Sequence, residues 1–458
     1  MKHTHTQTHP RANRRSSPSG RGVFQRCLGL LFLCLCVFGF GVGQSAPDNA
    51  RIHIYVGAPG KNRLPLALPQ PTGDTDYGDE FYQTVRRDLE LSGWFEVIDP
   101  AAYIEPKETG LRPGEFQFSD WETCGAAVLG KTGLKHKDSD RLRAEVWVYD
   151  VGGARKIGAK AFTADTESVR SLAHRIANEI ILRVTGQAGP FNTRFAVSGS
   201  FTGNKEIYLV DFDGHGLTRI TKNGSINIQP SWSSSGKKVS FTSYAQGNPD
   251  LYVADLTQGR INRLSARNGI NTGASWNPRA DVIALTLSPR GDPDIYTIDS
   301  NTGKRLSRLT RTNGIDVSPV FSPDGSKIAF VSERSGGAQI YVMNSDGSNA
   351  KRVTFQGGHN TDPVWSPDGE SLAFVARDKV FDIFTVKPDG SNLTRITQGE
   401  RDNEDPSWSP DGHYIGFSST RTGSSHIWMS TKDGTHQVQL TQGSGGYTNP
   451  AWSPTLTW

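Results

Sequence analysis

The residues best suited to chemistry form a column of short polar side chains that repeats through the second half of the chain. They stand five residues before a recurring aromatic residue: Asn227, Asn271, Asp316, Asn360, Asn403 and Tyr447. If the strands that they begin face a common centre, these side chains ring the mouth of a funnel, where they could bind a protein, a cation or water. Asn and Asp also end loops by bonding to nearby backbone groups, so a structural role stays open. Arg334 and Arg421, each in the loop after the next strand, are expected to flank the same face.

Motifs of common enzyme active sites are absent from the sequence. It contains no Gly-x-Ser-x-Gly nucleophile elbow, no His-Glu-x-x-His, no Cys-x-x-Cys and no P-loop. Asp211, Asp213 and Gly214 resemble the start of a calcium loop, but no acidic residue stands at the required distance, which favours a hairpin turn. Cys124 lies in an apolar stretch that is typical of a buried structural thiol. The residues therefore predict a protein with no catalytic centre, metal or cofactor.

A repeat with a period near 44 residues organises the chain from residue 190 onward. An aromatic residue followed by Ser or Asn recurs at Trp232, Trp276, Phe321, Trp365, Trp408 and Trp452. A second aromatic column stands at Tyr208, Tyr252, Tyr296, Tyr341, Phe384 and Trp428. Each unit has the pattern of four short strands, with Asp-Gly pairs in several of the turns between them. One such sheet cannot bury both of its faces alone, so the repeat predicts a six-bladed β-propeller with four-stranded blades.

The way in which the ring closes can also be predicted. The first unit, residues 194–221, has three strands and lacks the aromatic-Ser strand that begins every other unit. That strand occurs instead in residues 449–454. We therefore expect the C-terminal strand to pair with the first blade, because such pairing removes exposed sheet edges.

The first 45 residues have the layout of a secretory signal peptide. Six basic residues and no acid precede an apolar and glycine run over residues 27–43, and small residues follow at positions 45 and 46. An uncleaved anchor is the alternative. Without this segment the net charge falls from +4 to −2, which gives no basic signal for nucleic acid, and Cys124 becomes the single cysteine.

Residues 46–186 show no repeat and mix the two kinds of secondary structure, which predicts a small α/β domain before a propeller over residues 187–458. Strands are expected at 52–56, 94–98, 126–129 and 145–151. Helices are expected over residues 79–92 and between Thr166 and Gly186, since each carries an apolar stripe and is followed by a glycine.

Several motifs resemble those of one known family. Trp-Ser-Pro-Asp-Gly stands complete at residues 365–369 and 408–412, and as Phe-Ser-Pro-Asp-Gly at 321–325. With residues 88–93 and 148–151 of the first domain, these motifs are similar to the TolB family, the periplasmic propeller proteins of the Tol-Pal system. The resemblance covers nearly the whole chain after the signal. The motif is degraded at 232–236 and 276–280, which affects the quality of those turns more than the fold.

The resemblance implies a function as well as a fold. It implies a monomeric periplasmic adaptor whose funnel mouth binds the peptidoglycan-associated lipoprotein Pal, and which associates with the outer membrane through Pal. It also implies that the mature N-terminus contacts the inner-membrane protein TolA through Arg51, Ile52, His53, Ile54 and Tyr55. Together these contacts would support outer-membrane integrity and constriction in cell division, with no enzymatic activity and no nucleic acid.

The sequence is also compatible with two other functions. A propeller can recruit or regulate a periplasmic peptidase, in which case a pull-down would yield a hydrolase instead of a lipoprotein. It can also be a lyase with its site in the funnel, in which case turnover would depend on Asn271 and Asp316.

Overall fold

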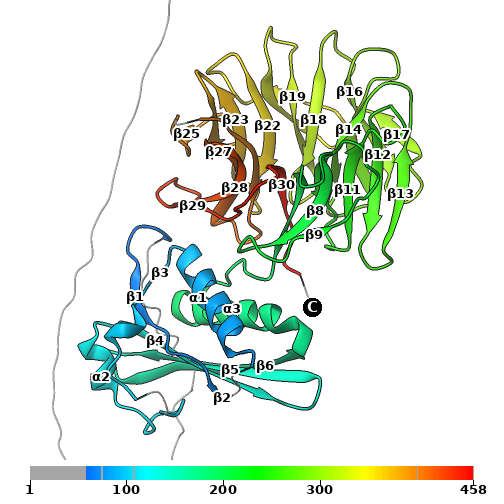
Figure 1. The fold of residues 1–458 in the computed structure, drawn as a ribbon. Coiled ribbons are helices and arrows are strands. Elements are labelled where there is room, and N and C mark those ends of the chain that lie inside the picture. The colour runs from blue at the N-terminus through cyan, green and yellow to red at the C-terminus, as the bar shows by residue number, and fades with distance from the viewer. Residues whose placement is uncertain (1–57, 74–75, 107–108, 400, 457–458) are drawn as a thin grey trace, which may run out of the picture. The chain divides into compact units, whose positions relative to one another are not determined.

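The computed structural model describes residues 58–73, 76–106, 109–399 and 401–456 (Figure 1). The signal segment 1–45, the strand expected at 52–56 and the TolA-contacting residues Arg51, Ile52, His53, Ile54 and Tyr55 lie outside the described residues. Within the described ranges, no helix combines the length and the apolar character that a membrane crossing requires.

The N-terminal part is an α/β fold with one mixed sheet. The strand order is β3-β1-β4-β5-β6, and β2 also pairs with β4. Its strands are β1 (Leu64–Ala67), β2 (Thr72–Gly73), β3 (Phe95–Val97), β4 (Val128–His136), β5 (Arg141–Asp150) and β6 (Arg155–Asp165). Its helical segments are α1 (Gly78–Leu91), η1 (Pro100–Ala102), α2 (Phe118–Thr123), η2 (Thr166–Ser168) and α3 (Val169–Thr185).

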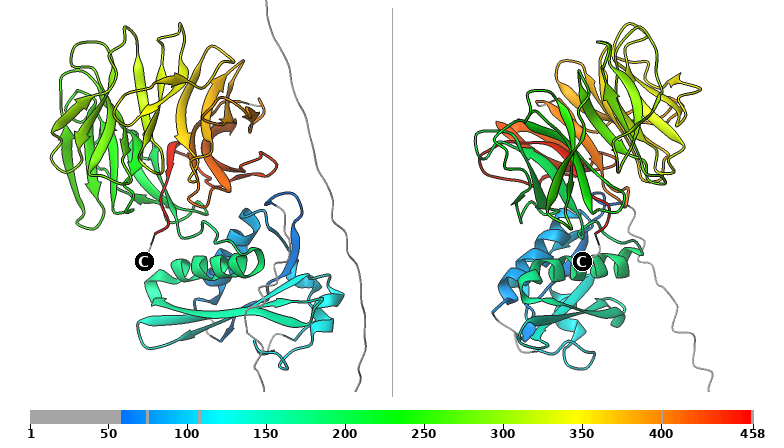
Figure 2. Two further views of the ribbon diagram at one scale, coloured as in Figure 1. Left: turned by 180° about the vertical axis from the view of Figure 1, so that it is seen from behind. Right: turned by 90° about the vertical axis from the view of Figure 1, so that its right-hand side faces the viewer.

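Helices α1 and α3 cover one face of this sheet (Figures 1 and 2). Both are amphipathic, and their apolar stripes meet each other and the alternate buried residues of β5 in one core. Helix α3 ends at Gly186, whose φ of 77° is the left-handed conformation that glycine adopts without a Cβ clash. Both helices were predicted from sequence within two residues of their observed ends.

Strand β4 extends beyond the expected strand and contains a buried lysine. Lys131 is 2% exposed, and its Nζ lies 2.6 Å from Glu105 Oε2 and 3.1 Å from Thr109 Oγ1. The expected strand covered residues 126–129 only, and a lysine in a strand ordinarily marks a solvated position. Strand β6 was not predicted from the sequence. Its first five residues, 155–159, contain four that are charged, small or glycine, which hides the strand pattern.

The rest of the described chain forms six antiparallel sheets of four strands each, arranged as the blades of a propeller (Figure 1). Blades β10–β13 and β14–β17 comprise Asn227–Trp232, Lys238–Ser243, Asp250–Asp255 and Arg260–Ser265, then Asn271–Trp276, Val282–Leu287, Asp294–Asp299 and Arg305–Arg308. Blades β18–β21 and β22–β25 comprise Asp316–Phe321, Lys327–Ser332, Gln339–Asn344 and Lys351–Arg352, then Asn360–Trp365, Leu372–Arg377, Phe381–Val386 and Thr394–Arg395. Blade β26–β29 comprises Asn403–Trp408, Tyr414–Thr422, Ser424–Thr431 and Gln437–Gln439.

The first blade, which the C-terminal strand was expected to join, confirms the predicted closure. Its order is β30-β7-β8-β9, with strands Tyr447–Trp452, Arg194–Gly199, Glu206–Asp211 and Thr218–Arg219. Strand β30 pairs antiparallel with β7, so that Ala451 lies opposite Ala196 and Trp452 opposite Phe195. The Trp452 indole Nε1 also donates to Thr193 Oγ1 at 2.8 Å. The C-terminal strand therefore completes the first blade.

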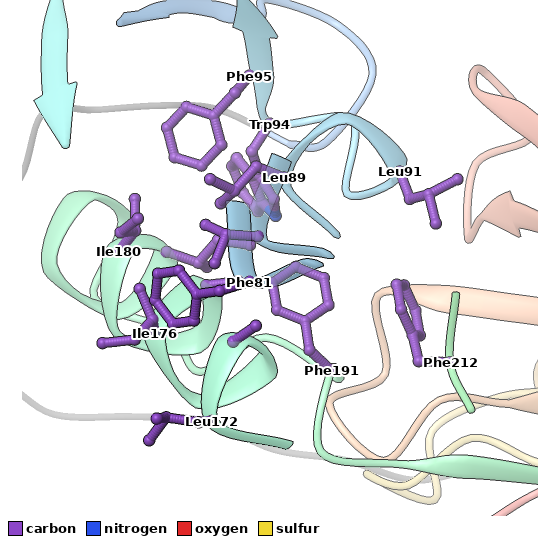
Figure 3. Close-up of a cluster of buried hydrophobic side chains, with 14 of the residues drawn as sticks. Phe81, Leu89, Leu91, Trp94, Phe95, Leu172, Ile176, Ile180, Phe191 and Phe212 are labelled. Carbon is purple, nitrogen blue, oxygen red and sulfur yellow. The ribbon is translucent and has the colours of Figure 1, made fainter. Parts of the chain in front are cut away.

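The apolar core of the α/β part continues into this first blade (Figure 3). Phe191, which follows α3, meets Phe212, which follows β8, with ring centroids 5.0 Å apart. Phe212 in turn lies 6.0 Å from the Trp452 ring of the closing strand. A polar contact accompanies this core, because the Arg87 guanidinium of α1 donates to the Asp213 carbonyl at 2.9 Å.

Candidate functional site

The predicted polar column begins the innermost strand of each blade, but its side chains do not line the funnel. Asn227, Asn271 and Asp316 are 0% exposed, and Asn360 and Asn403 are 1% exposed. Tyr447 is also buried, at 5% exposed. The expectation that these residues ring an open mouth is therefore wrong in its geometry. Side chains of an inner strand alternate between the two faces of the blade, and both faces are covered by neighbouring blades.

The four asparagines of the column instead join successive blades and hold the loops that precede them. Asn227 Nδ2 donates to Glu206 Oε2 of the preceding blade at 3.0 Å and to the Ser225 carbonyl at 3.1 Å. Asn403 Nδ2 makes the same pair of contacts, to Asp382 Oδ1 at 3.1 Å and to the Arg401 carbonyl at 2.9 Å. The structural alternative, a short polar residue that ends a loop by bonding to backbone, describes their contacts.

The two arginines that were expected to flank this column do lie beside it. Arg334 Nη2 lies 3.0 Å from Asp316 Oδ1, and Arg421 Nη2 donates to Asn403 Oδ1 at 2.7 Å. The Arg334 side chain is 23% exposed, so each guanidinium bridges the buried column and the loop surface. The structure thus brings these arginines together with two of the predicted residues, as partners inside the fold.

The channel itself is lined by a ring of residues that lies two positions further along each inner strand. The ring consists of Gln229, Gly273, Ser318, Asp362, Asp405 and Asn449, which border a cavity of about 350 Å³. Each of them has a positive φ, between 51° and 62°. Each also interrupts the pairing of its strand with the next one, as a β-bulge does. The bulge turns the backbone so that this position, and not the one before it, reaches the channel.

A signal for this ring exists in the sequence. Five of its members precede a proline, at Pro230, Pro319, Pro363, Pro406 and Pro450, and the sixth is Gly273. Proline cannot donate to the strand ladder and is confined to bulges and edges inside a sheet. A proline at the same position of five inner strands therefore marks a bulge, and the residue before it is the one that reaches the channel.

Carboxyl groups make one side of the channel acidic. Burial, together with the nearby Asp405 charge, raises the pKa of Asp362 to about 6. Burial also raises the pKa of Glu404 to about 7, and Asp405, Asp402 and Asp362 add to the effect. Asp405 itself accepts hydrogen bonds from Asn449 N at 3.0 Å and Asn449 Nδ2 at 2.8 Å. Of these carboxyl groups Asp362 and Asp405 line the channel, which can thus accept hydrogen bonds and hold a proton on Asp362 at mildly acidic pH.

The other chemically suggestive residues have structural surroundings. Asp213 sits in a hairpin turn beside Gly214, whose φ is 85°, and accepts from Arg170 Nη2 at 2.5 Å. Cys124 is half-buried and its Sγ donates to the Trp121 carbonyl at 3.2 Å. Among the residues that the structure describes, no group of three or more His, Cys, Asp and Glu side chains could hold a metal ion.

Exposed apolar side chains mark the loops around the predicted column, and sequence reasoning missed them. Ile226 and Ile315, 47% and 39% exposed, each stand directly before a column residue. Phe355, in the loop before Asn360, is 67% exposed. Exposed apolar side chains in loops can supply the apolar contacts of a protein interface. We call these three residues the rim residues.

Comparisons with known proteins agree with this architecture. A family model described as "TolB beta propeller domain" matches residues 181–456, and one described as "TolB amino-terminal domain" matches residues 52–157. A protein of Geobacter sulfurreducens with the name Tol-Pal system protein TolB is 38% identical over 222 residues, which are 47% of this chain and 49% of that protein. A protein of the same name from Syntrophotalea carbinolica is 37% identical over 221 residues, again 47% and 49% of the two chains.

The chain thus spans about half the length of the curated relatives that it matches. Among solved structures, the crystal structure of TolB from Acinetobacter baumannii has a TM-score of 0.78 and 24% identity. The match covers 88% of this chain and 99% of that one, and it shows that the two share a fold.

Proposed function

The chain belongs to the TolB family, and we propose that it is a periplasmic adaptor of the Tol-Pal system that acts by binding other proteins and not by catalysis. The observation that carries this proposal is the family match over both parts of the chain, with relatives that bear the name Tol-Pal system protein TolB. The predicted secretory signal supports a place in the cell envelope. We further propose that the adaptor contributes to outer-membrane integrity and to constriction during cell division.

The peptidoglycan-associated lipoprotein Pal is the proposed partner at the rim. Ile226, Ile315 and Phe355 offer apolar contacts there, and they stand on loops that buried hydrogen bonds hold in place. Preorganised loops bind with a smaller loss of conformational entropy than mobile ones. The buried column residues Asn227, Asn271, Asp316, Asn360, Asn403 and Tyr447, with Arg334 and Arg421, would then position the rim for the lipoprotein instead of contacting it.

TolA is the proposed partner of the N-terminal segment that contains Arg51, Ile52, His53, Ile54 and Tyr55. This part of the proposal rests on the family resemblance alone, because these residues lie outside the described ranges.

Photo-crosslinking in the native envelope tests the proposal. A crosslinking amino acid at Ile226 should capture the lipoprotein, identified by mass spectrometry. The same amino acid at Ile261, which is 42% exposed on an outer strand, provides the matched control and should capture much less of it. Capture of a hydrolase at position 226, or equal capture of the lipoprotein at both positions, would contradict the proposal.

A further inference from the structure

In two blades an arginine lies over a pair of aromatic rings, one from the second strand of the blade and one from the third. In the β18–β21 blade, the Arg334 Cζ lies 5.2 Å from the Phe330 ring centroid and 5.0 Å from that of Tyr341. The same guanidinium donates to Ser332 Oγ at 2.7 Å and to Asp316 at 3.0 Å. A guanidinium over aromatic faces is a cation–π contact, and here polar acceptors hold it in place.

The β26–β29 blade repeats this arrangement. The Arg421 Cζ lies 5.5 Å from the Phe417 centroid and 4.5 Å from that of Trp428. Its Nη2 donates to Asn403 Oδ1 at 2.7 Å. Each arginine stands four residues after the aromatic residue of the second strand.

The blade between these two lacks the arginine. Phe374 and Phe384 of the β22–β25 blade stack with ring centroids 5.9 Å apart, the same separation as that of Phe330 and Tyr341. Four residues after Phe374 stands Asp378, which is exposed. A cavity of about 330 Å³ lies over this pair, and Phe374, Phe384, Asn360, Asp378 and Asp382 are among its lining residues. We call it the Phe374 cavity.

The acceptor that would hold the arginine is present in this blade. Asn360 occupies the position of Asp316 and Asn403, and it is 1% exposed. Its Nδ2 donates to Gln339 Oε1 and to the Gln356 carbonyl, both at 2.9 Å. Among the described residues no group donates to its Oδ1, whereas Asn403 Oδ1 receives Arg421.

We propose that the Phe374 cavity is a binding site for an arginine side chain of a partner protein, which enters where Arg334 and Arg421 lie in the neighbouring blades. The guanidinium would stack on Phe374 and Phe384 and donate to Asn360 Oδ1. This site goes beyond the proposed function, because it is defined by the arginine side chain that it binds and not by the identity of the lipoprotein. It lies beside the rim residue Phe355, which also lines the cavity.

The charges around the cavity admit a cation. Asp378 stands where the neighbouring blades have Arg334 and Arg421, so this loop position supplies an anion instead of a cation. Two arginines of the chain line the cavity at its edges. Arg395 of the outer strand is paired with Asp382, and its Cζ lies 5.8 Å from the Phe384 ring centroid. The Arg377 Cζ lies 5.2 Å from the Phe381 ring centroid, outside the aromatic pair. The β18–β21 blade carries Arg352 at the equivalent outer position together with Arg334, so the two cations can coexist.

The test is titration of the full chain with N-acetylarginine amide, followed by amide chemical shifts in nuclear magnetic resonance. N-acetylcitrulline amide is the matched probe, because it has nearly the same shape and no charge. We expect saturable shifts for residues 376–384 with the arginine probe and binding at least about fivefold weaker with citrulline. Equal binding of the two probes, tighter binding of N-acetylleucine amide, or no shift up to the solubility limit would overturn the proposal.

Two variants locate the site. Asp378→Arg puts a guanidinium at the position of Arg334 and should abolish binding of the probe, while Asp346→Arg, in an exposed turn of the neighbouring blade, should leave it unchanged. Phe384→Leu keeps an apolar side chain without the aromatic face and should weaken binding at least about fivefold. Unchanged binding to both Asp378→Arg and Phe384→Leu would overturn the assignment. This result is independent of lipoprotein binding, so either proposal can fail without the other.

Discussion

The Tyr414 hydroxyl, in the second strand of the β26–β29 blade, donates a 2.7 Å hydrogen bond to the Ser92 carbonyl at the end of α1. Tyr414 is 1% exposed and Ser92 0% exposed, so this bond joins residues 322 positions apart inside the apolar core. A buried carbonyl that loses its donor costs free energy beyond the bond itself. The α/β part and the propeller are therefore expected to unfold together.

Tyr414→Phe should lower the free energy of unfolding by about 1 to 3 kcal/mol, because the Ser92 carbonyl is left without this donor. The matched control is Tyr208→Phe, since the Tyr208 hydroxyl is buried and has no hydrogen-bond partner among the described residues. Removal of the Tyr208 hydroxyl should lower the free energy of unfolding only slightly. Urea unfolding followed by circular dichroism measures both. An equal loss in the two variants would show that the Tyr414 bond contributes nothing specific.

Glu404 should make the protein less stable as the pH rises. Its pKa is raised from 4.5 to about 7 in the folded chain, so the folded state binds the proton more tightly than the unfolded state. The stabilisation is complete below about pH 4.5 and is lost as the pH rises through 7. Glu404→Gln should therefore raise the free energy of unfolding by about 1 kcal/mol at about pH 8 and leave it nearly unchanged at about pH 4.

The control for this prediction is Glu333→Gln, a change at an exposed loop position that should shift stability at neither pH. Urea unfolding at the two pH values measures the free energy of unfolding of both variants. A Glu404→Gln variant with the same pH dependence as the wild type would contradict the assigned cause.

The pair Asn271→Arg and Asp316→Arg separates a structural column from a binding surface. Both positions are 0% exposed, so each arginine would have to enter a closed polar network or force it open. We expect a loss of several kcal/mol and a fall in the melting temperature. Unchanged melting of the double variant in differential scanning calorimetry would mean that these side chains face open solvent after all.

Trp452 tests the closure of the ring. Its ring lies 4.5 Å from Phe195, and it is 7% exposed. Trp452→Ala should cost about 3 to 5 kcal/mol, because it leaves a cavity where the C-terminal strand meets the first blade. Trp452→Phe keeps most of the apolar packing and should cost clearly less. Similar losses in both variants would show that packing at this junction does not govern the stability of the ring.

The repeat made most of the fold predictable from sequence. The aromatic columns fixed the number of blades, and the three-strand first unit with the strand around Trp452 fixed the closure. Turn residues and the repeat period depend on residues that are close in sequence, so they can be recognised without a structure. Strand β4 was harder, because Lys131 is polar by type but is buried through its long-range contact with Glu105.

The site was less predictable, because it depends on backbone geometry. The column from Asn227 to Tyr447 was found correctly as a column, yet a bulge turns the next-but-one residue, such as Gln229, into the channel instead. The Asn360 Oδ1 acceptor is recognised as open only because Asp316 and Asn403, at the same position of the neighbouring blades, each bind an arginine. Such a difference appears only when the blades are compared in three dimensions.

The central claim is that the rim of the propeller binds the peptidoglycan-associated lipoprotein, and isothermal titration calorimetry tests it most directly. The rim variant Ile226→Asp with Ile315→Asp is compared with Ile261→Asp with Leu306→Asp, which changes two equally exposed apolar residues on outer strands. We predict that the rim variant binds the lipoprotein at least about tenfold more weakly than the wild type, with an unchanged melting temperature, and that the outer-strand variant binds normally. Equal affinity of both variants for the lipoprotein, or no binding by the wild type, would contradict the account.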